Sequence, residues 1–282
     1  MMEDSFESDS LWKSNYSQIA ENVECQKTIL EFVKIEKFLS EFGFLSFERD
    51  FILCQEKVFS LQRLAISVEL TAGSIISCCK AGCMADANSL LRKFRDDMFF
   101  YLYIQVYDSI IKSGKDSPKA LEMEHNIQKW IENNLSNLQI SAVMKAIGTE
   151  PRVQEAVKKY GLQSYFSKVG HRLNNYVHGN GISYYNCQMT AYNPKELNKQ
   201  LSETLRDMRF ITVFFLFLLT LCSPLSIMST DYTDYLDFDM APPEGSQYWV
   251  APFVTQFFKE NLNLIDENCM AFLKNETCMS FD

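Results

Sequence analysis

Residues 210–222 read FITVFFLFLLTLC, and this stretch decides the fold class. It carries no charge and is apolar on every side of a helix, so other helices must surround it. A Ser-Pro pair follows it, which leaves 13 strongly apolar residues, the length of a buried core helix. The uncharged run continues to Thr230, so a single membrane anchor over 210–230 is the alternative. We favour a core or dimer-interface helix.

The composition favours helices along the rest of the chain as well. Only 10 glycines and 7 prolines occur in 282 residues, so long stretches lie between turns. The apolar share of 47% and the charged share of 22% are typical of a globular protein with a sizeable core. We therefore expect an all-α fold, a bundle of long helices with additional N- and C-terminal helices.

Apolar residues at helical spacing and the breaks between them define the expected organisation. We expect a frayed tail over 1–12, one helical domain over 13–230, an acidic linker over 231–246, and a C-terminal helix within 247–282 that packs on the same domain. Residues 179–193 read as a polar loop. The helices are expected at about 13–42, 47–80, 86–113, 118–133, 140–147, 151–160, 163–178, from 194 through the apolar stretch, and 247–273.

The nine cysteines indicate free thiols rather than a disulfide framework or a metal site. Their number is odd, and no Cys-x-x-Cys spacing occurs. Cys79 and Cys83 would share a helix face, but two small thiols on a core face explain that spacing better than a metal does. We expect no metal, no cofactor and a cytoplasmic protein with reduced thiols.

Residues 170–180, GHRLNNYVHGN, hold two of the three histidines. Arg172 and His178 are separated by five residues, and Gly179 fits as the residue that ends the helix. A guanidinium binds phosphate with its planar fork, and an imidazole transfers a proton near neutral pH. This spacing predicts that both side chains lie on one helix face. His171 lies about 100° around the helix from Arg172, so we do not expect it to be catalytic.

A basic segment leads into this motif within a chain whose net charge is −9. The net charge argues against nucleic-acid binding over the whole surface but leaves room for a local basic cleft. We expect phosphate or RNA contacts from Lys158, Lys159 and Lys168, with a solvated helix face as the alternative. The segment's charges are Lys145, Arg152, Lys158, Lys159, Lys168 and Arg172 against Glu150 and Glu155.

A second charged cluster lies on the helix expected at 86–113. Arg92, Arg95 and Asp96 run directly into an aromatic, apolar half of that helix, so we expect them to be partly buried. Buried charges need partners, which makes these residues candidates for lining a site. The alternative is a simple intrahelical ion pair between Arg92 and Asp96. The third histidine, His125, is expected on the surface.

Arg172-x5-His178 in an all-α chain resembles the Arg-x(4–6)-His motif of the HEPN superfamily, and the YVHG ending at 176–179 is also similar. The resemblance covers about residues 85 to 222. It implies a metal-independent ribonuclease with His178 as general acid/base and Arg172 as phosphate stabiliser. Asn174 and Asn175 would position the scissile phosphate, together with Arg92, Arg95 and Asp96. Leu173 stands where active members often have a polar residue.

This chemistry makes sense because RNA supplies its own nucleophile, the 2′-hydroxyl, so cleavage needs a base, an acid and a stabiliser of the charged phosphorane. Two copies facing each other across a two-fold axis would supply both imidazoles. The resemblance implies products with a 2′,3′-cyclic phosphate and a toxin or antiphage effector. Its expected partners are RNA, a second copy or a higher oligomer, and an antitoxin or sensor protein, but not DNA. The alternative is a catalytically inert helical module that binds a protein, with membrane anchoring through 210–230 as a further variant.

Overall fold

The structure is a computed structural model. It describes residues 11–46, 51–54, 57–114, 118–134, 139–189 and 193–281. These residues form an all-α protein with one small β-hairpin, as the composition predicts. The α-helices are α1 (Leu11–Glu21), α2 (Val23–Leu45), α3 (Gln62–Lys80), α4 (Met84–Lys112), α5 (Pro118–Ile131), α6 (Ile140–Ile147), α7 (Pro151–Lys159), α8 (Leu162–Val177), α9 (Gly181–Met189), α10 (Pro194–Cys222), α11 (Asp231–Asp237), α12 (Pro252–Asn261) and α13 (Cys269–Glu276). Strands β1 (Phe51–Cys54) and β2 (Lys57–Ser60) pair antiparallel, and the short 3-10 helices are η1 (Pro224–Ile227), η2 (Ser246–Tyr248) and η3 (Leu262–Leu264).

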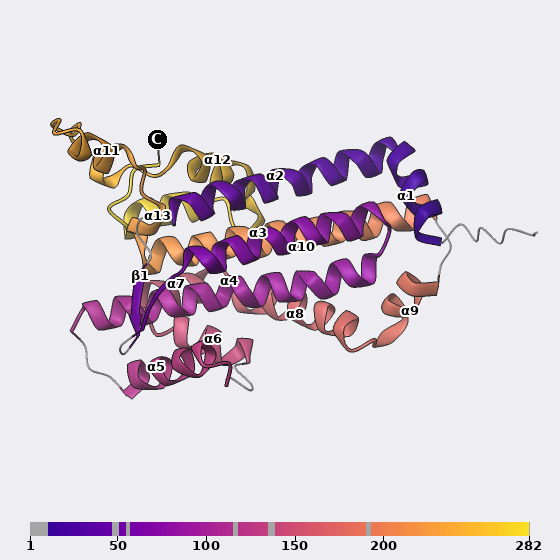
Figure 1. Ribbon diagram of the computed structural model, residues 1–282, viewed down its shortest axis with the longest axis horizontal. Helices are drawn as coiled ribbons and strands as arrows, with labels where there is room; N and C mark the ends of the chain where they lie inside the picture. The colour runs from indigo at the N-terminus through magenta and orange to yellow at the C-terminus, as the bar shows by residue number, and fades with distance from the viewer. Residues whose placement is uncertain are drawn as a thin grey trace, which may run out of the picture.

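The four longest helices, α2, α3, α4 and α10, lie side by side and form the centre of the molecule (Figure 1). Helix α8 packs along α4, and α6 covers another part of α4. Every residue from Phe210 to Cys222 of α10 is buried. The Phe214 ring lies 5.6 Å from the ring of Phe99 and 5.5 Å from those of Phe166 and Phe210. The core-helix interpretation is therefore confirmed, and none of the described helices is long and apolar enough to cross a membrane.

The N-terminal third differs from the expected pair of helices. The first is divided at Asn22, whose side-chain oxygen accepts hydrogen bonds from the backbone N–H groups of Glu24 and Cys25 and thereby begins α2. The expectation of a helix from about 47 was wrong, because residues 51–54 and 57–60 form the paired strands β1 and β2. Burial alternates there, with Ile52 and Cys54 inside and Leu53 exposed, which is the period of a strand. Residues 1–10, the larger part of the expected tail, lie outside the described residues.

Three later segments also differ from the expectations. The stretch predicted as a polar loop contains helix α9. The expected C-terminal helix over about 247–273 is instead η2, α12, η3 and α13 in succession, because Pro252 begins a new helix and the chain turns again after Asn261. The segment expected as an acidic linker contains α11, which has no buried residue. Helix α12 packs on α2, and its Phe257 ring lies 4.1 Å from that of Phe38.

Candidate functional site

Helix α8 carries the Arg-His motif and ends where the sequence predicts. Leu173 is buried with Phe166 and Val169 on the core side of the helix. His178 follows the last helical residue, and its backbone N–H donates to the carbonyl of Asn174 at 3.0 Å. Gly179 has a φ of 63°, a left-handed conformation that costs glycine little, so the helix stops there.

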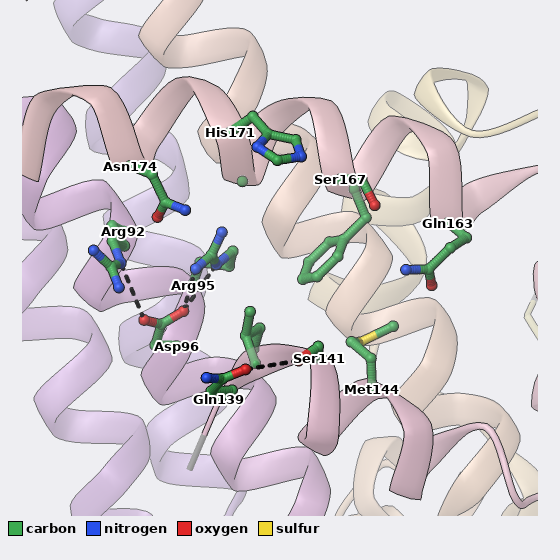
Figure 2. Close-up of a pocket in the computed structure, with 13 residues that line it drawn as sticks. Arg92, Arg95, Asp96, Gln139, Ser141, Met144, Gln163, Ser167, His171 and Asn174 are labelled. Atoms are coloured by element: carbon green, nitrogen blue, oxygen red, sulfur yellow. Dashed lines mark hydrogen bonds and ion pairs between the residues drawn. The ribbon is translucent and has the colours of Figure 1, made fainter. Parts of the chain in front are cut away.

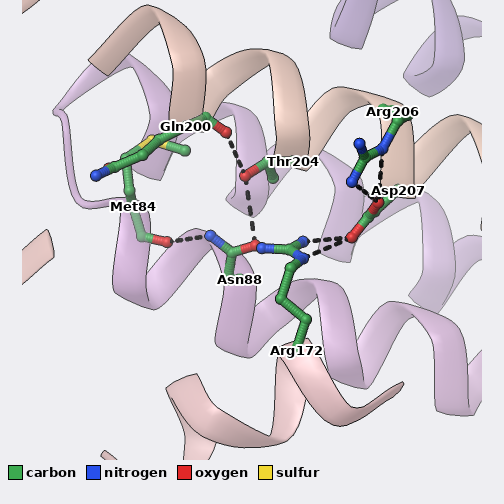
Figure 3. Close-up of polar contacts among 7 residues, drawn as sticks. All are labelled: Met84, Asn88, Arg172, Gln200, Thr204, Arg206 and Asp207. Atoms are coloured by element: carbon green, nitrogen blue, oxygen red, sulfur yellow. Dashed lines mark hydrogen bonds and ion pairs between the residues drawn. The ribbon is translucent and has the colours of Figure 1, made fainter. Parts of the chain in front are cut away.

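Arg172 points from α8 toward α10, where it meets a carboxylate that sequence reasoning missed (Figure 3). Its Nε donates to Asp207 Oδ2 at 2.7 Å, and its Nη2 lies 2.6 Å from the same oxygen. Asp207 is 1% exposed, and Oδ1 of the carboxylate also accepts from Arg206 at 3.2 Å. The guanidinium carbon of Arg172 lies 5.6 Å from the centre of the Tyr176 ring. Two arginines and one buried carboxylate therefore join α8 to α10 with a net positive charge.

His178 does not share the helix face of Arg172. Six residues turn an α-helix by about 600°, which is about 120° short of two full turns. His178 lies seven residues after His171, which places the two side chains only about 20° apart around the helix. It lies four residues after Asn174, which places those two about 40° apart. The expected common face of Arg172 and His178 is therefore replaced by a face with His171, Asn174 and His178. The His178 side chain is exposed, and it makes no hydrogen bond or ion pair with any described residue.

A pocket of about 500 Å³ lies between α4, α6 and α8 (Figure 2). It brings together four residues that the sequence nominated, Arg92, Arg95, Asp96 and Asn174. Arg172 is not among its lining residues. The other lining residues come from two segments. Gln139, just before α6, and Ile140, Ser141 and Met144 of α6 form one wall, and α8 contributes Gln163, Phe166, Ser167, Gly170 and His171.

The charged end of this pocket holds two guanidinium groups around one carboxylate. Arg95 is 2% exposed, and its Nε and Nη2 donate to Asp96 Oδ1 at 2.8 and 2.6 Å. Arg92 Nε lies 3.7 Å from the other oxygen of Asp96. A Cβ on Gly170 would lie 2.9 Å from Arg95 Nη1, so this glycine lets the guanidinium approach α8 closely. One carboxylate cannot neutralise two guanidiniums, so this end can bind an anion.

Two further features of the pocket escaped the sequence analysis. His171, which we did not expect to be catalytic, lines the pocket. The side-chain oxygen of Asn174 is buried and has no hydrogen-bond partner among the described residues, and an unpaired buried group of this kind costs about 1–3 kcal/mol. The α8 residues recur at positions 163, 166, 167, 170, 171 and 174, a helical stripe that the sequence contains. Nothing in the sequence pairs that stripe with α6.

The remaining nominated residues do not assemble at the pocket. Lys158, Lys159 and Lys168 are exposed and lie outside its lining. Lys159 Nζ is 4.8 Å from the centre of the Phe272 ring, so it packs against the C-terminal helices. Asn175 is exposed on α8.

No group of three or more metal-binding side chains occurs among the described residues. Burial raises the pKa of the Cys79 thiol, which fits a core residue rather than a thiolate ligand. No protein-family model, curated protein or solved structure matches this chain.

Proposed function

We propose that this chain is a metal-independent endoribonuclease that cleaves RNA beside the C-terminal end of α8. One observation carries the proposal. The α8 face that lines this pocket continues, one turn beyond Asn174, to the imidazole of His178, which is exposed and unpaired among the described residues. A phosphate held by Arg92 and Arg95 would thus lie next to a group that can transfer a proton.

The reaction needs no nucleophile from the protein. His178 takes the proton from the ribose 2′-hydroxyl, whose oxygen attacks the adjacent phosphorus. The bond to the 5′-oxygen breaks, and that oxygen receives a proton from a general acid, which leaves a 2′,3′-cyclic phosphate. Arg92 and Arg95 stabilise the phosphorane, because Asp96 already holds their guanidinium groups in place before RNA binds.

A second copy of the chain supplies the general acid through its own His178. Three large apolar side chains surround the end of α8 and are exposed, Val177 at 44%, Ile182 at 69% and Tyr185 at 57%. A two-fold dimer that covers them would bring the two imidazoles toward one another. Homodimerisation and cleavage are therefore parts of one proposal.

Arg172 acts in this scheme as a positioning residue. Its guanidinium is committed to Asp207, so it fixes α8 against α10 and thereby sets the position of His178. This role differs from the phosphate contact that the HEPN resemblance implies.

The test is cleavage of single-stranded RNA by the purified chain in the presence of EDTA. His178→Ala should lower the rate by about 100-fold or more, the usual contribution of a general acid or base. His125→Ala is the matched control, because His125 is exposed on α5 and lies outside the pocket. Equal rates for the two variants would refute the assignment of His178.

The second candidate is an inert helical module that binds a protein, and the Arg172–Asp207 pair favours it because such a pair is also expected of a purely structural arginine. Intact RNA after incubation with the wild-type chain would support that module. If RNA is cleaved, we propose a toxin or antiphage effector restrained by an antitoxin or sensor protein. Expression of the wild type should then arrest growth, and His178→Ala should relieve the arrest.

A further inference from the structure

The pocket changes its chemistry along α8. Its arginine end lies beside Asn174, and none of the described residues that line the opposite end, beside Gln163, is charged (Figure 2). We propose that this neutral end binds a single unpaired nucleobase next to the scissile phosphate, so that the substrate is single-stranded RNA with a base preference at one position. The inference rests on the proposed function and specifies its substrate.

The order of groups along α8 follows from the rise of the helix. Gln163 precedes Asn174 by eleven residues, or about 16 Å, and Asn174 precedes His178 by four residues, or about 6 Å. The neutral end, the arginine end and the imidazole therefore follow one another along a single face. An RNA strand that places a phosphate at the arginines can extend its neighbouring nucleoside toward Gln163.

The neutral end offers the groups that read a base edge. Gln163 provides an amide donor and an amide acceptor, and Ser141 and Ser167 provide hydroxyls (Figure 2). Ser141 Oγ donates at 3.5 Å to Oε1 of Gln139, whose side chain lies beside Asp96 at the arginine end (Figure 2). Amide side chains can pair with two atoms of one base, and such a contact discriminates between bases.

Apolar side chains also line the pocket. Met144 lies at the same end as Gln163 (Figure 2), and its thioether can pack against the face of an aromatic base. The Phe166 ring lies 5.7 Å from the guanidinium carbon of Arg95, so it borders the arginine end. The combination of apolar walls with a few polar groups is typical of sites for small organic groups. A free phosphate would use only the arginine end.

The pocket has the size of a site for one small organic group. Its volume of about 500 Å³ lies within the usual range for such sites, and a base pair with its stacked neighbours is larger than one such group. A base must therefore leave the stack to enter, which is how proteins read loops and single strands of RNA.

The experiment is cleavage of a random-sequence single-stranded RNA pool, followed by sequencing of the new ends. The wild type should favour one or two bases at one position beside the cut. Gln163→Ala should reduce that preference about fivefold or more and leave neighbouring positions unchanged, since one base contact is lost. The control is Gln154→Ala, an exposed glutamine on α7 outside the pocket, which should keep the wild-type preference.

Three outcomes would overturn the inference. These are a wild-type preference retained in Gln163→Ala, an equal loss in Gln154→Ala, and cleavage of duplex RNA as fast as of single strands. If the wild type cleaves no RNA, titration with the four nucleoside monophosphates separates the two proposals. Base-selective binding that Gln163→Ala abolishes would support the base site while the ribonuclease proposal fails, and unselective or absent binding would reject the base site as well.

Discussion

Replacing Arg172 by methionine isolates the charge of the α8–α10 connection, because methionine keeps much of the aliphatic stem. The change leaves Asp207, 1% exposed, with Arg206 as its remaining described cation at 3.2 Å. Removing one partner of a buried ion pair costs about 3–5 kcal/mol. We expect Arg172→Met to lower the free energy of unfolding by only about 2 kcal/mol, because Arg206 still pairs with Asp207. The Arg172 side chain is also 23% exposed, so solvent screens the pair.

Urea unfolding followed by circular dichroism measures this loss, and the midpoint of thermal unfolding should fall by about 3–4 °C for a chain of this size. Arg206→Met is the matched control, since that side chain is 55% exposed, and it should cost less than about 1 kcal/mol. Asp207→Asn combined with Arg172→Met should cost clearly less than the sum of the single changes. Strict additivity, or an equal loss in Arg206→Met, would refute a coupled and buried Arg172–Asp207 pair.

Other predictions test the core and the thiols. Phe214→Ala should lower the free energy of unfolding by about 3–5 kcal/mol because its ring is wholly buried among aromatic rings, whereas Phe238→Ala, 76% exposed, should change it by less than about 0.5 kcal/mol in denaturant titrations. Cys278 is exposed and should react with iodoacetamide in the native protein, whereas Cys269 should react only on unfolding, as mass spectrometry of the alkylated peptides would show. Burial raises the pKa of Cys269 from 9.0 to about 12, so the folded state holds this proton more tightly than the unfolded state. The free energy of unfolding should therefore fall as the pH rises from about 9 to 12, and a rise over that range in urea titrations would contradict this sign.

The resemblance to HEPN proteins nominated residues from two helices, and the structure divides them. Arg92, Arg95, Asp96 and Asn174 meet in one pocket, because their charges and amide lie where α4 and α8 pack together. Arg172 faces the other way, since the rotation of α8 that buries Leu173 turns the preceding side chain toward α10. The spacing argument could locate the helix and its end, but it could not specify which neighbour each face would meet.

The sequence alone determined the features that depend on residues close together in the chain. The all-round apolar stretch at 210–222 required a central buried helix, and Gly179 marked the end of α8. Only the tertiary structure decided the long-range partners. Asp207 lies 35 residues after Arg172 in the sequence. Helix α6 forms one wall of the pocket, and no local sequence pattern predicts that contact. The physical reason is that hydrogen bonding within a helix is set by the chain's own backbone, whereas the partner of a side chain depends on how helices rotate and pack against one another.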